Sequence, residues 1–169
     1  MTIYKDRLND LNNKKLIKEN NYIIYWMQNT QRIKYNFGLK RAIEMSKTFE
    51  KPIIVFFSLG SSFFIQNKRK LYFLLEGLID IKEKLKDLNI EMIIDYSKVS
   101  KNLLDLANNS ICLITDKGYL RVEKKLNFKV SKNVTCKMII AESNLVVPVE
   151  IASQKQEYAA YTLRPKIKT

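Results

Sequence analysis

Short apolar runs alternate with amphipathic segments along most of the chain. The runs are rich in β-branched and aromatic residues, and they cover residues 22–26, 52–58, 91–96, 111–116 and 135–142. Between them, apolar residues recur three and four positions apart, most clearly over residues 67–88. This spacing predicts helices, which we also expect over residues 36–49, 100–108 and 120–130. Continuous apolar strands that alternate with helices indicate a parallel sheet covered on both faces.

The pattern favours an α/β fold of the doubly wound, Rossmann-like type. Right-handed crossovers place the five parallel strands in the order 3-2-1-4-5, numbered along the chain, with helices on both faces. Residues 1–20 are polar with leucine and isoleucine at helical spacing, which predicts a helical extension before the domain. Residues 21–150 are then the α/β domain, and residues 151–169 are expected to begin a linker.

A ligand site is expected between the carboxyl ends of the first and fourth strands, where the crossovers leave toward opposite faces. Polar side chains follow both strands, namely Gln28, Gln31 and Arg32 after the first and Asp116, Tyr119 and Arg121 after the fourth. The loop after the second strand adds Ser61 and Phe63. Together these groups would suit a flat heterocycle with polar edges. The alternative is that the arginines pair with carboxylates at helix starts and that the aromatic rings pack beneath the loops.

Composition narrows the chemistry further. The chain has no histidine, which excludes Ser-His-Asp and Cys-His catalysis in their usual form. Its four glycines are not spaced as a dinucleotide-binding GxGxxG motif or as a P-loop. Cys112 and Cys136 both lie in apolar stretches and are expected to be reduced core residues of a cytoplasmic protein. No apolar run approaches the roughly 20 residues that cross a bilayer, so we expect no membrane partner. Because no residues form a self-contained active site, we expect a binding domain.

Charge leaves an alternative function open. The formal net charge is +13, from 30 Lys and Arg against 17 Asp and Glu. Residues 117–137 hold seven of these cations and one acid, Glu123. Such a strip is either a solvated helix face or a charge-driven nucleic-acid-binding module. The abundance of Lys, Asn, Ile and Tyr also fits a compositional bias of the source genome.

Several segments resemble the N-terminal domain of the photolyase/cryptochrome family and occur in the same order along the chain. The segment YIIYWMQNTQRIKYNFGL (residues 22–39) has the strand, the arginine and the helix-starting asparagine of that domain, in a form like class II photolyases. Further segments look like class II sequences in the same order, namely KRKLYFLLEGL (68–78), LITDKGYLR (113–121) and NLVVPVEIASQKQEYAAYTLRPKI (144–167). The resemblance covers nearly all of the chain from residue 20 onward.

The resemblance implies the light-harvesting domain of a class II deoxyribodipyrimidine photo-lyase, which splits cyclobutane pyrimidine dimers in UV-damaged DNA. Such enzymes hold FAD in a C-terminal helical domain, to which residues 151–169 would lead. The N-terminal domain of some members binds an antenna chromophore, commonly 8-hydroxy-5-deazaflavin or a folate. By position, the pocket would be lined or supported by Met27, Gln28, Gln31, Arg32 and Asn36, with Ser61, Phe63, Asp116, Tyr119 and Arg121 on its other side.

Without the FAD-binding domain, this chain alone is expected to lack repair activity. A stand-alone nucleotide-binding α/β protein remains a further alternative.

Overall fold

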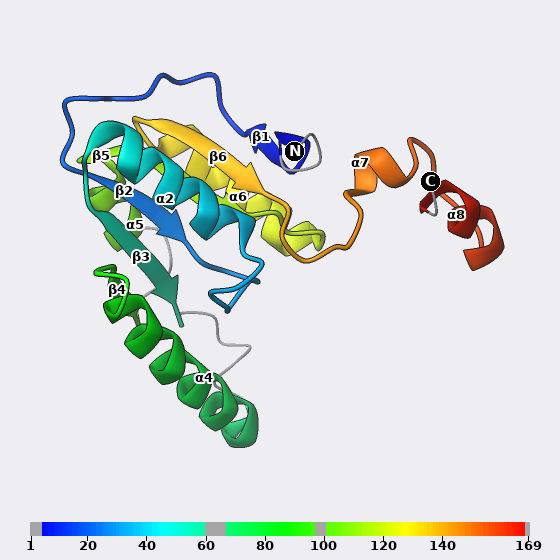
Figure 1. Cartoon of the computed structure of the whole chain (residues 1–169), viewed down its shortest axis with the longest axis horizontal. Coiled ribbons are helices and arrows are strands. Elements are labelled where there is room, and N and C mark those ends of the chain that lie inside the picture. The colour runs from blue at the N-terminus through cyan, green and yellow to red at the C-terminus, as the bar shows by residue number, and fades with distance from the viewer. Residues whose placement is uncertain (1–4, 60–66, 97–100, 168–169) are drawn as a thin grey trace.

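A six-stranded sheet organises the chain, whose computed structural model describes residues 5–59, 67–96 and 101–167 (Figure 1). The strands are β1 (Leu8–Asp10), β2 (Tyr22–Trp26), β3 (Ile53–Ser58), β4 (Glu91–Asp95), β5 (Ser110–Asp116) and β6 (Lys137–Ala141). They lie in the order β1-β6-β5-β2-β3-β4. Strands β2 to β6 pair in parallel, and β1 is antiparallel to β6. The predicted order of the five parallel strands is therefore confirmed, and the sheet has a sixth strand that was not predicted.

The helix predicted within residues 1–20 is wrong for residues 8–20, which contain strand β1 and no helix. Its apolar residues divide between the two faces of the sheet. Leu8 and Leu16 pack on the core that includes Tyr25, whereas Leu11 and Ile17 pack on the core that includes Trp26. An extended segment can place apolar side chains in both cores. The helix-like spacing of these residues therefore belongs to a strand and to a connection that runs along the sheet.

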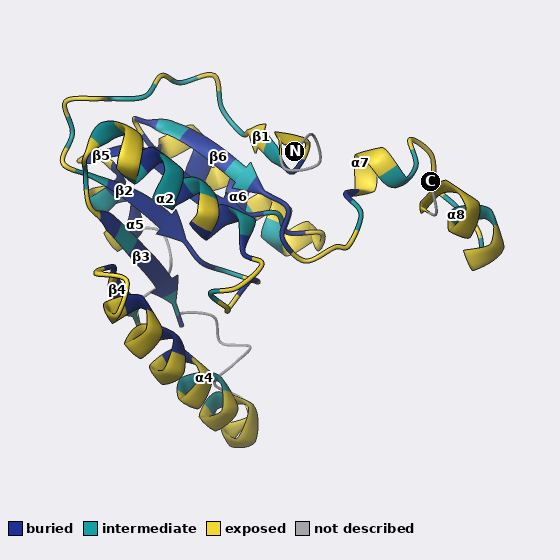
Figure 2. Cartoon of the chain, in the orientation of Figure 1, coloured by how far each residue is buried: buried dark blue, intermediate teal, exposed yellow. Residues whose placement is uncertain are grey.

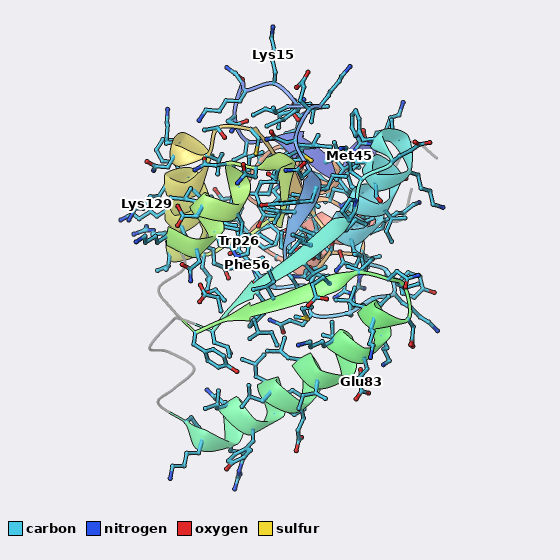
Figure 3. All side chains as sticks on the ribbon, turned by 90° about the vertical axis from the view of Figure 1, so that its left-hand side faces the viewer. Lys15, Trp26, Met45, Phe56, Glu83 and Lys129 are labelled. Atoms are coloured by element: carbon cyan, nitrogen blue, oxygen red, sulfur yellow. The ribbon has the colours of Figure 1, made fainter. Side chains whose placement is uncertain are left out.

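Helices cover both faces of the sheet, as predicted. Helices α2 (Phe37–Phe49) and α4 (Lys68–Lys86) supply one core, and α5 (Lys101–Ala107) and α6 (Arg121–Asn133) supply the other. The central strands β2, β3 and β5 between them are almost wholly buried (Figure 2). Met45 of α2 and Lys129 of α6 lie on opposite sides of the sheet, and Lys129 points outward (Figure 3).

Strand β2 runs through the centre of this arrangement and serves both cores. Its odd-numbered residues, Ile23 and Tyr25, face α2, and its even-numbered residues, Ile24 and Trp26, face the opposite core. This alternation follows from the period of two in a strand. Because both faces are covered, every position from residue 23 to residue 26 is apolar or aromatic, which explains the unbroken run in the sequence.

The segment after β6 leaves the sheet. Helices α7 (Val149–Ala152) and α8 (Ala160–Ile167) lie beyond the end of β6, away from the strands (Figure 1). Neither helix contains a fully buried residue. In the described ranges, no helix has the length and apolar character needed to cross a membrane.

Candidate functional site

The loop after β2 is organised by one buried carboxylate. Asp116 ends β5 and is 1% exposed. Its Oδ2 accepts the backbone N–H groups of Gln28, Asn29 and Thr30, each at 2.9 Å. Its Oδ1 accepts the hydroxyl of Tyr25 at 2.8 Å. Burial raises the pKa of Asp116, and these four hydrogen bonds oppose that effect.

The far end of the same loop is held by Asn36, the N-cap residue of α2. Its Oδ1 accepts the backbone N–H of Leu39 at 2.8 Å. Its Nδ2 donates to the Tyr25 hydroxyl and to the carbonyl oxygens of Thr30 and Arg32, at 2.9, 3.1 and 3.0 Å. An asparagine at this position therefore caps the helix and closes the loop with one side chain. The amide of Asn36 is engaged within the protein.

Two predicted site residues at the start of the loop face inward. Met27 is fully buried in the core beneath α2 and α4. The amide of Gln28 turns toward α6, where its Nε2 donates to Thr115 Oγ1 at 2.6 Å and to Asn127 Oδ1 at 2.7 Å. Asn127 in turn donates to the carbonyl of Asp116 at 3.2 Å. Sequence reasoning missed Asn127, although an asparagine beside the apolar positions of α6 was the available signal.

Arg32 connects the loop to the segment that follows β6. Its guanidinium donates to the carbonyl of Ser143 at 2.6 Å, to Asn144 Oδ1 at 3.2 Å and to the carbonyl of Tyr35 at 3.3 Å. The sequence left open that Arg32 pairs with a carboxylate at a helix start. In the described part of the chain, Arg32 binds these carbonyl and amide oxygens and no carboxylate. Arg32 thus tethers two connections that lie more than 100 residues apart in the sequence.

Tyr119 and Arg121 belong to a different neighbourhood, around β6 and α6. The Tyr119 hydroxyl donates to Glu142, a buried carboxylate that sequence reasoning missed. Lys117 lies 3.5 Å from Glu142 and 3.0 Å from Glu150. Burial, together with the hydrogen bond to Glu142, raises the pKa of Tyr119. Arg121 is an exposed first residue of α6.

Gln31 lines a groove between the loop and α4. The groove has a volume of about 600 Å³, and its lining is Gln31, Arg69, Lys70, Phe73, Leu74, Gly77, Leu78 and Ile81. Four of these side chains are apolar, and two cations and an amide accompany them. The predicted residues Ser61 and Phe63 lie outside the described residues. Among the described predicted residues, Gln31 is the one whose side chain lines this groove.

Gly77 forms part of the groove wall in the middle of α4. A Cβ added to it would meet no described atom within 4 Å. Glycine inside a helix costs about 0.5–1 kcal/mol relative to alanine. Packing against the described residues therefore does not require a glycine at this position.

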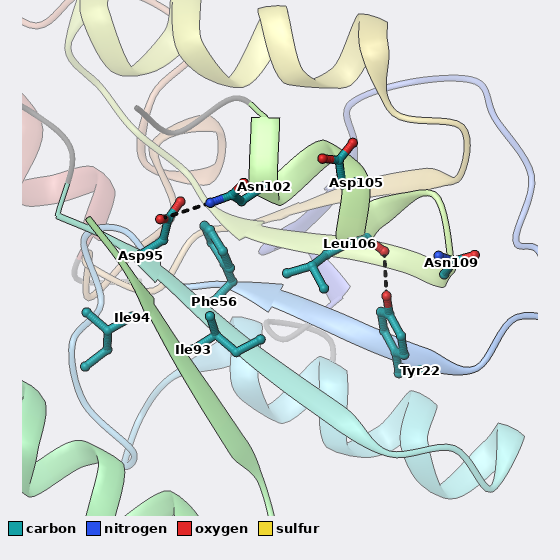
Figure 4. Close-up of a pocket in the computed structure, with 9 residues that line it drawn as sticks. All are labelled: Tyr22, Phe56, Ile93, Ile94, Asp95, Asn102, Asp105, Leu106 and Asn109. Atoms are coloured by element: carbon teal, nitrogen blue, oxygen red, sulfur yellow. Dashed lines mark hydrogen bonds between the residues drawn. The ribbon is translucent and has the colours of Figure 1, made fainter. Parts of the chain in front are cut away.

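A second cavity, of about 430 Å³, lies on the opposite face of the sheet between β3, β4 and α5 (Figure 4). Among the described residues, its polar lining includes Asp95 and Asp105 and no cation. Asn102 donates to Asp95 at 3.2 Å, and the Tyr22 hydroxyl donates to the carbonyl of Leu106 at 2.9 Å. None of the predicted site residues lines this cavity in the described part of the chain.

Comparisons with known proteins agree with one another over nearly the whole chain. The family model for DNA photolyase matches residues 23–169. The deoxyribodipyrimidine photo-lyase of Methanothermobacter thermautotrophicus is 36% identical over 166 residues, which are 98% of this chain and 37% of that protein. The enzyme of the same name from Arabidopsis thaliana is 32% identical over 150 residues, which are 86% of this chain and 30% of that protein. The one from Potorous tridactylus is 26% identical over 150 residues, which are 85% of this chain and 28% of that protein.

A solved structure of a universal stress protein in complex with cAMP covers 75% of this chain and 100% of its own, with a TM-score of 0.49 and 12% identity. The chain spans about a third of the length of the curated relatives it matches.

Proposed function

Because the chain belongs to the DNA photolyase family as an N-terminal photolyase/cryptochrome domain, we propose that it is the light-harvesting domain of a deoxyribodipyrimidine photo-lyase. The proposed parent protein is of class II and repairs cyclobutane pyrimidine dimers in UV-damaged DNA. FAD would be held by a C-terminal helical domain of that parent, reached through residues 151–169. The names of the matched relatives and the extent of the match support this proposal.

The groove between the loop after β2 and α4 is the proposed chromophore site, and it is the observation that carries the proposal. Its volume of about 600 Å³ falls in the range of small-molecule sites. Phe73 is 80% exposed and offers an aromatic face to a planar ring. Arg69 and Lys70 lie at the same groove and would bind an anionic tail. These residues fit 8-hydroxy-5-deazaflavin or a folate, either of which would supply the absorption of light when bound.

The remaining predicted residues take supporting roles in this proposal. Asp116 and Asn36 fix the two ends of the loop that presents Gln31, and Gln31 Nε2 is itself held by the carbonyl of Gln28 at 2.7 Å. Met27, Gln28 and Arg32 anchor the same loop to the core, to α6 and to the segment after β6. Ser61 and Phe63 lie outside the described residues, and they are proposed to contribute to the same site. Tyr119 and Arg121 have no place at the groove, because Tyr119 binds Glu142 and Arg121 begins α6 on the other face.

The test is a titration of the chain with 8-hydroxy-5-deazaflavin and with a folate, followed by absorbance and fluorescence. We expect binding to the wild-type chain and at least a tenfold loss of affinity for Gly77→Leu, because the added side chain occupies the groove. Gly77→Ala is the matched control. It should retain binding and stabilise the fold by about 0.5–1 kcal/mol, through helix propensity alone.

Two results would overturn the proposal at different points. Equal chromophore affinity of Gly77→Leu and wild type would remove the groove as the site while leaving the light-harvesting function. Tight binding of ATP with no affinity for either chromophore would instead favour the stand-alone nucleotide-binding alternative.

A further inference from the structure

The outer face of α6 carries a dense row of positive charge. Five exposed cations lie on it, namely Arg121, Lys124, Lys125, Lys129 and Lys132. At 3.6 residues per turn they fall within an arc of about 140°, and at 1.5 Å per residue they extend over about 16 Å. The opposite side of the helix is packed on the sheet through Val130 and Leu126. The row is therefore a ridge on the surface of the domain.

The acid within this helix does not neutralise the row. Glu123 Oε2 accepts the backbone N–H groups of Tyr119 and Leu120 at 2.8 and 3.0 Å, so it caps the start of α6. Among the described residues, none of the five cations forms an ion pair with a carboxylate. Helix α4 differs, because Lys84 pairs there with Asp80 at 2.6 Å. The charge of the α6 row is thus directed at solvent.

The N-terminal segment adds a further cation to the end of the row. Lys14 Nζ donates to the carbonyl oxygens of Lys132 and Val134. A hollow of about 400 Å³ lies beside it, with Lys14, Phe128 and Lys132 in its lining. Residues more than 100 positions apart therefore contribute to one basic surface, which consists of the α6 row and Lys14.

We propose that this basic surface binds the sugar–phosphate backbone of duplex nucleic acid. A duplex carries one negative charge per about 1.7 Å of its axis, and a row of solvent-directed cations gains affinity by releasing condensed counterions. Such a contact would add a sequence-independent anchor to the domain. The inference depends on the charges of α6 and not on the chromophore groove, which lies on the opposite face of the sheet.

Two observations favour the phosphate backbone over other anionic partners. A helix that binds a membrane interface inserts a broad apolar face, whereas the apolar side of α6 is already packed on the sheet. The exposed ring of Phe128 lies within the cationic row, but Lys132 Nζ lies 5.1 Å from its centroid. One face of that ring is therefore engaged by a cation, which argues against a platform for stacked bases.

The experiment measures fluorescence anisotropy of a labelled, undamaged 24-base-pair DNA duplex with the 169-residue chain between 50 and 200 mM NaCl. We expect the variant Lys124→Gln/Lys125→Gln/Lys129→Gln to bind at least tenfold more weakly at 50 mM. The slope of log affinity against log salt should fall by about 2–3, since each phosphate contact contributes about 0.9. Glutamine has nearly the helix propensity of lysine, so the melting temperature should be unchanged.

The matched control is Lys82→Gln/Lys84→Gln/Lys86→Gln, which removes the same charge from exposed positions of α4. It should change the affinity less than about twofold. Equal losses in both triple variants would show a general effect of net charge and would overturn the proposal. Failure of the wild type to bind DNA would also overturn the proposal. Binding to vesicles of 70% phosphatidylcholine and 30% phosphatidylserine without binding to DNA would point to a membrane surface instead. Chromophore binding by the α6 variant should remain intact, so failure here is separable from failure of the light-harvesting function.

Discussion

Asp116 shows how one side chain can shape a loop without facing a ligand. Its carboxylate accepts three consecutive backbone N–H groups and one hydroxyl, all from the segment that follows β2 or from β2 itself. Buried N–H groups need partners, and a charged acceptor forms stronger hydrogen bonds than a neutral one. The loop that presents Gln31 therefore depends on Asp116 for its conformation.

Replacing Asp116 by asparagine should destabilise the fold by about 1–3 kcal/mol, the usual cost of an unsatisfied buried group. The asparagine Nδ2 would meet either backbone N–H groups or the Tyr25 hydroxyl, which already receives a hydrogen bond from Asn36. Urea unfolding of wild type and of Asp116→Asn measures the difference in the free energy of unfolding. Asp105→Asn on α5 is the control and should change the stability by less than about 0.5 kcal/mol, since Asp105 is exposed.

The difference in stability between wild type and Asp116→Asn should depend on pH. Burial raises the pKa of Asp116 in the folded state above its value of 3.8. The folded state then binds the proton more tightly, so the contribution of Asp116 to stability is present at low pH and is lost as pH rises through the folded pKa. The stability advantage of wild type over Asp116→Asn should be larger at pH 4 than at pH 7. An advantage that grows with pH would contradict the raised pKa.

At the scale of elements, the contact between α2 and β2 is unusually close. Gly38 lies in the first turn of α2, and a Cβ there would be 2.6 Å from Cε2 of Tyr25. The ring of Tyr25 cannot easily withdraw, because its hydroxyl is held by Asp116 and Asn36. The two helix glycines therefore differ. Gly38 permits close packing, whereas Gly77 borders open space.

Gly38→Ala should destabilise the protein by about 1–3 kcal/mol, the usual cost of overpacking a core. This loss occurs although alanine is the better helix former by about 1 kcal/mol. Gly77→Ala has the same gain in propensity without the clash, so it should be stabilising. Chemical denaturation of the two variants in parallel measures the contrast, and a stabilised Gly38→Ala protein would show that α2 can move away from β2.

At the scale of the whole molecule, Arg7 joins the beginning of the described chain to the segment after β6. It is 4% exposed, and its guanidinium donates to the carbonyl oxygens of Glu142, Leu145 and Val146 at 3.1, 2.7 and 2.5 Å. The same group lies 4.6 Å from the centroid of the Phe37 ring. Arg7 therefore holds the segment through which the chain leaves the sheet.

Arg7→Met should release that segment, because methionine keeps an apolar stem but donates no hydrogen bond. We expect faster amide hydrogen exchange over residues 143–149, with a loss of stability of about 1–3 kcal/mol. Exchange in β2 and β5 should remain slow. Lys15→Met, at an exposed position, is the control, and unchanged exchange over residues 143–149 in the Arg7 variant would contradict this role.

The sequence by itself determined the five parallel strands, the helices between them and the order of those strands. Apolar periodicity is a local property, and the right-handed crossover rule then leaves few arrangements. It also indicated which loops meet at the carboxyl edge, since the connections after β2 and β5 are in contact through Asp116. The bounds of the elements shifted by only a few residues, as between the predicted 135–142 and the observed Lys137–Ala141 of β6.

Only the tertiary structure decided what the side chains at that edge do. The direction of Gln28 toward Asn127, the pairing of β1 with β6 and the contact of Arg7 with Val146 each join residues about 100 or more positions apart. Local patterns carry no information about such partners, because a buried polar group is satisfied by whatever the fold brings within hydrogen-bonding distance. For the same reason, only the tertiary structure placed Gln31 at a groove beside α4 and added Lys14 to the basic helix that the charge pattern had already indicated.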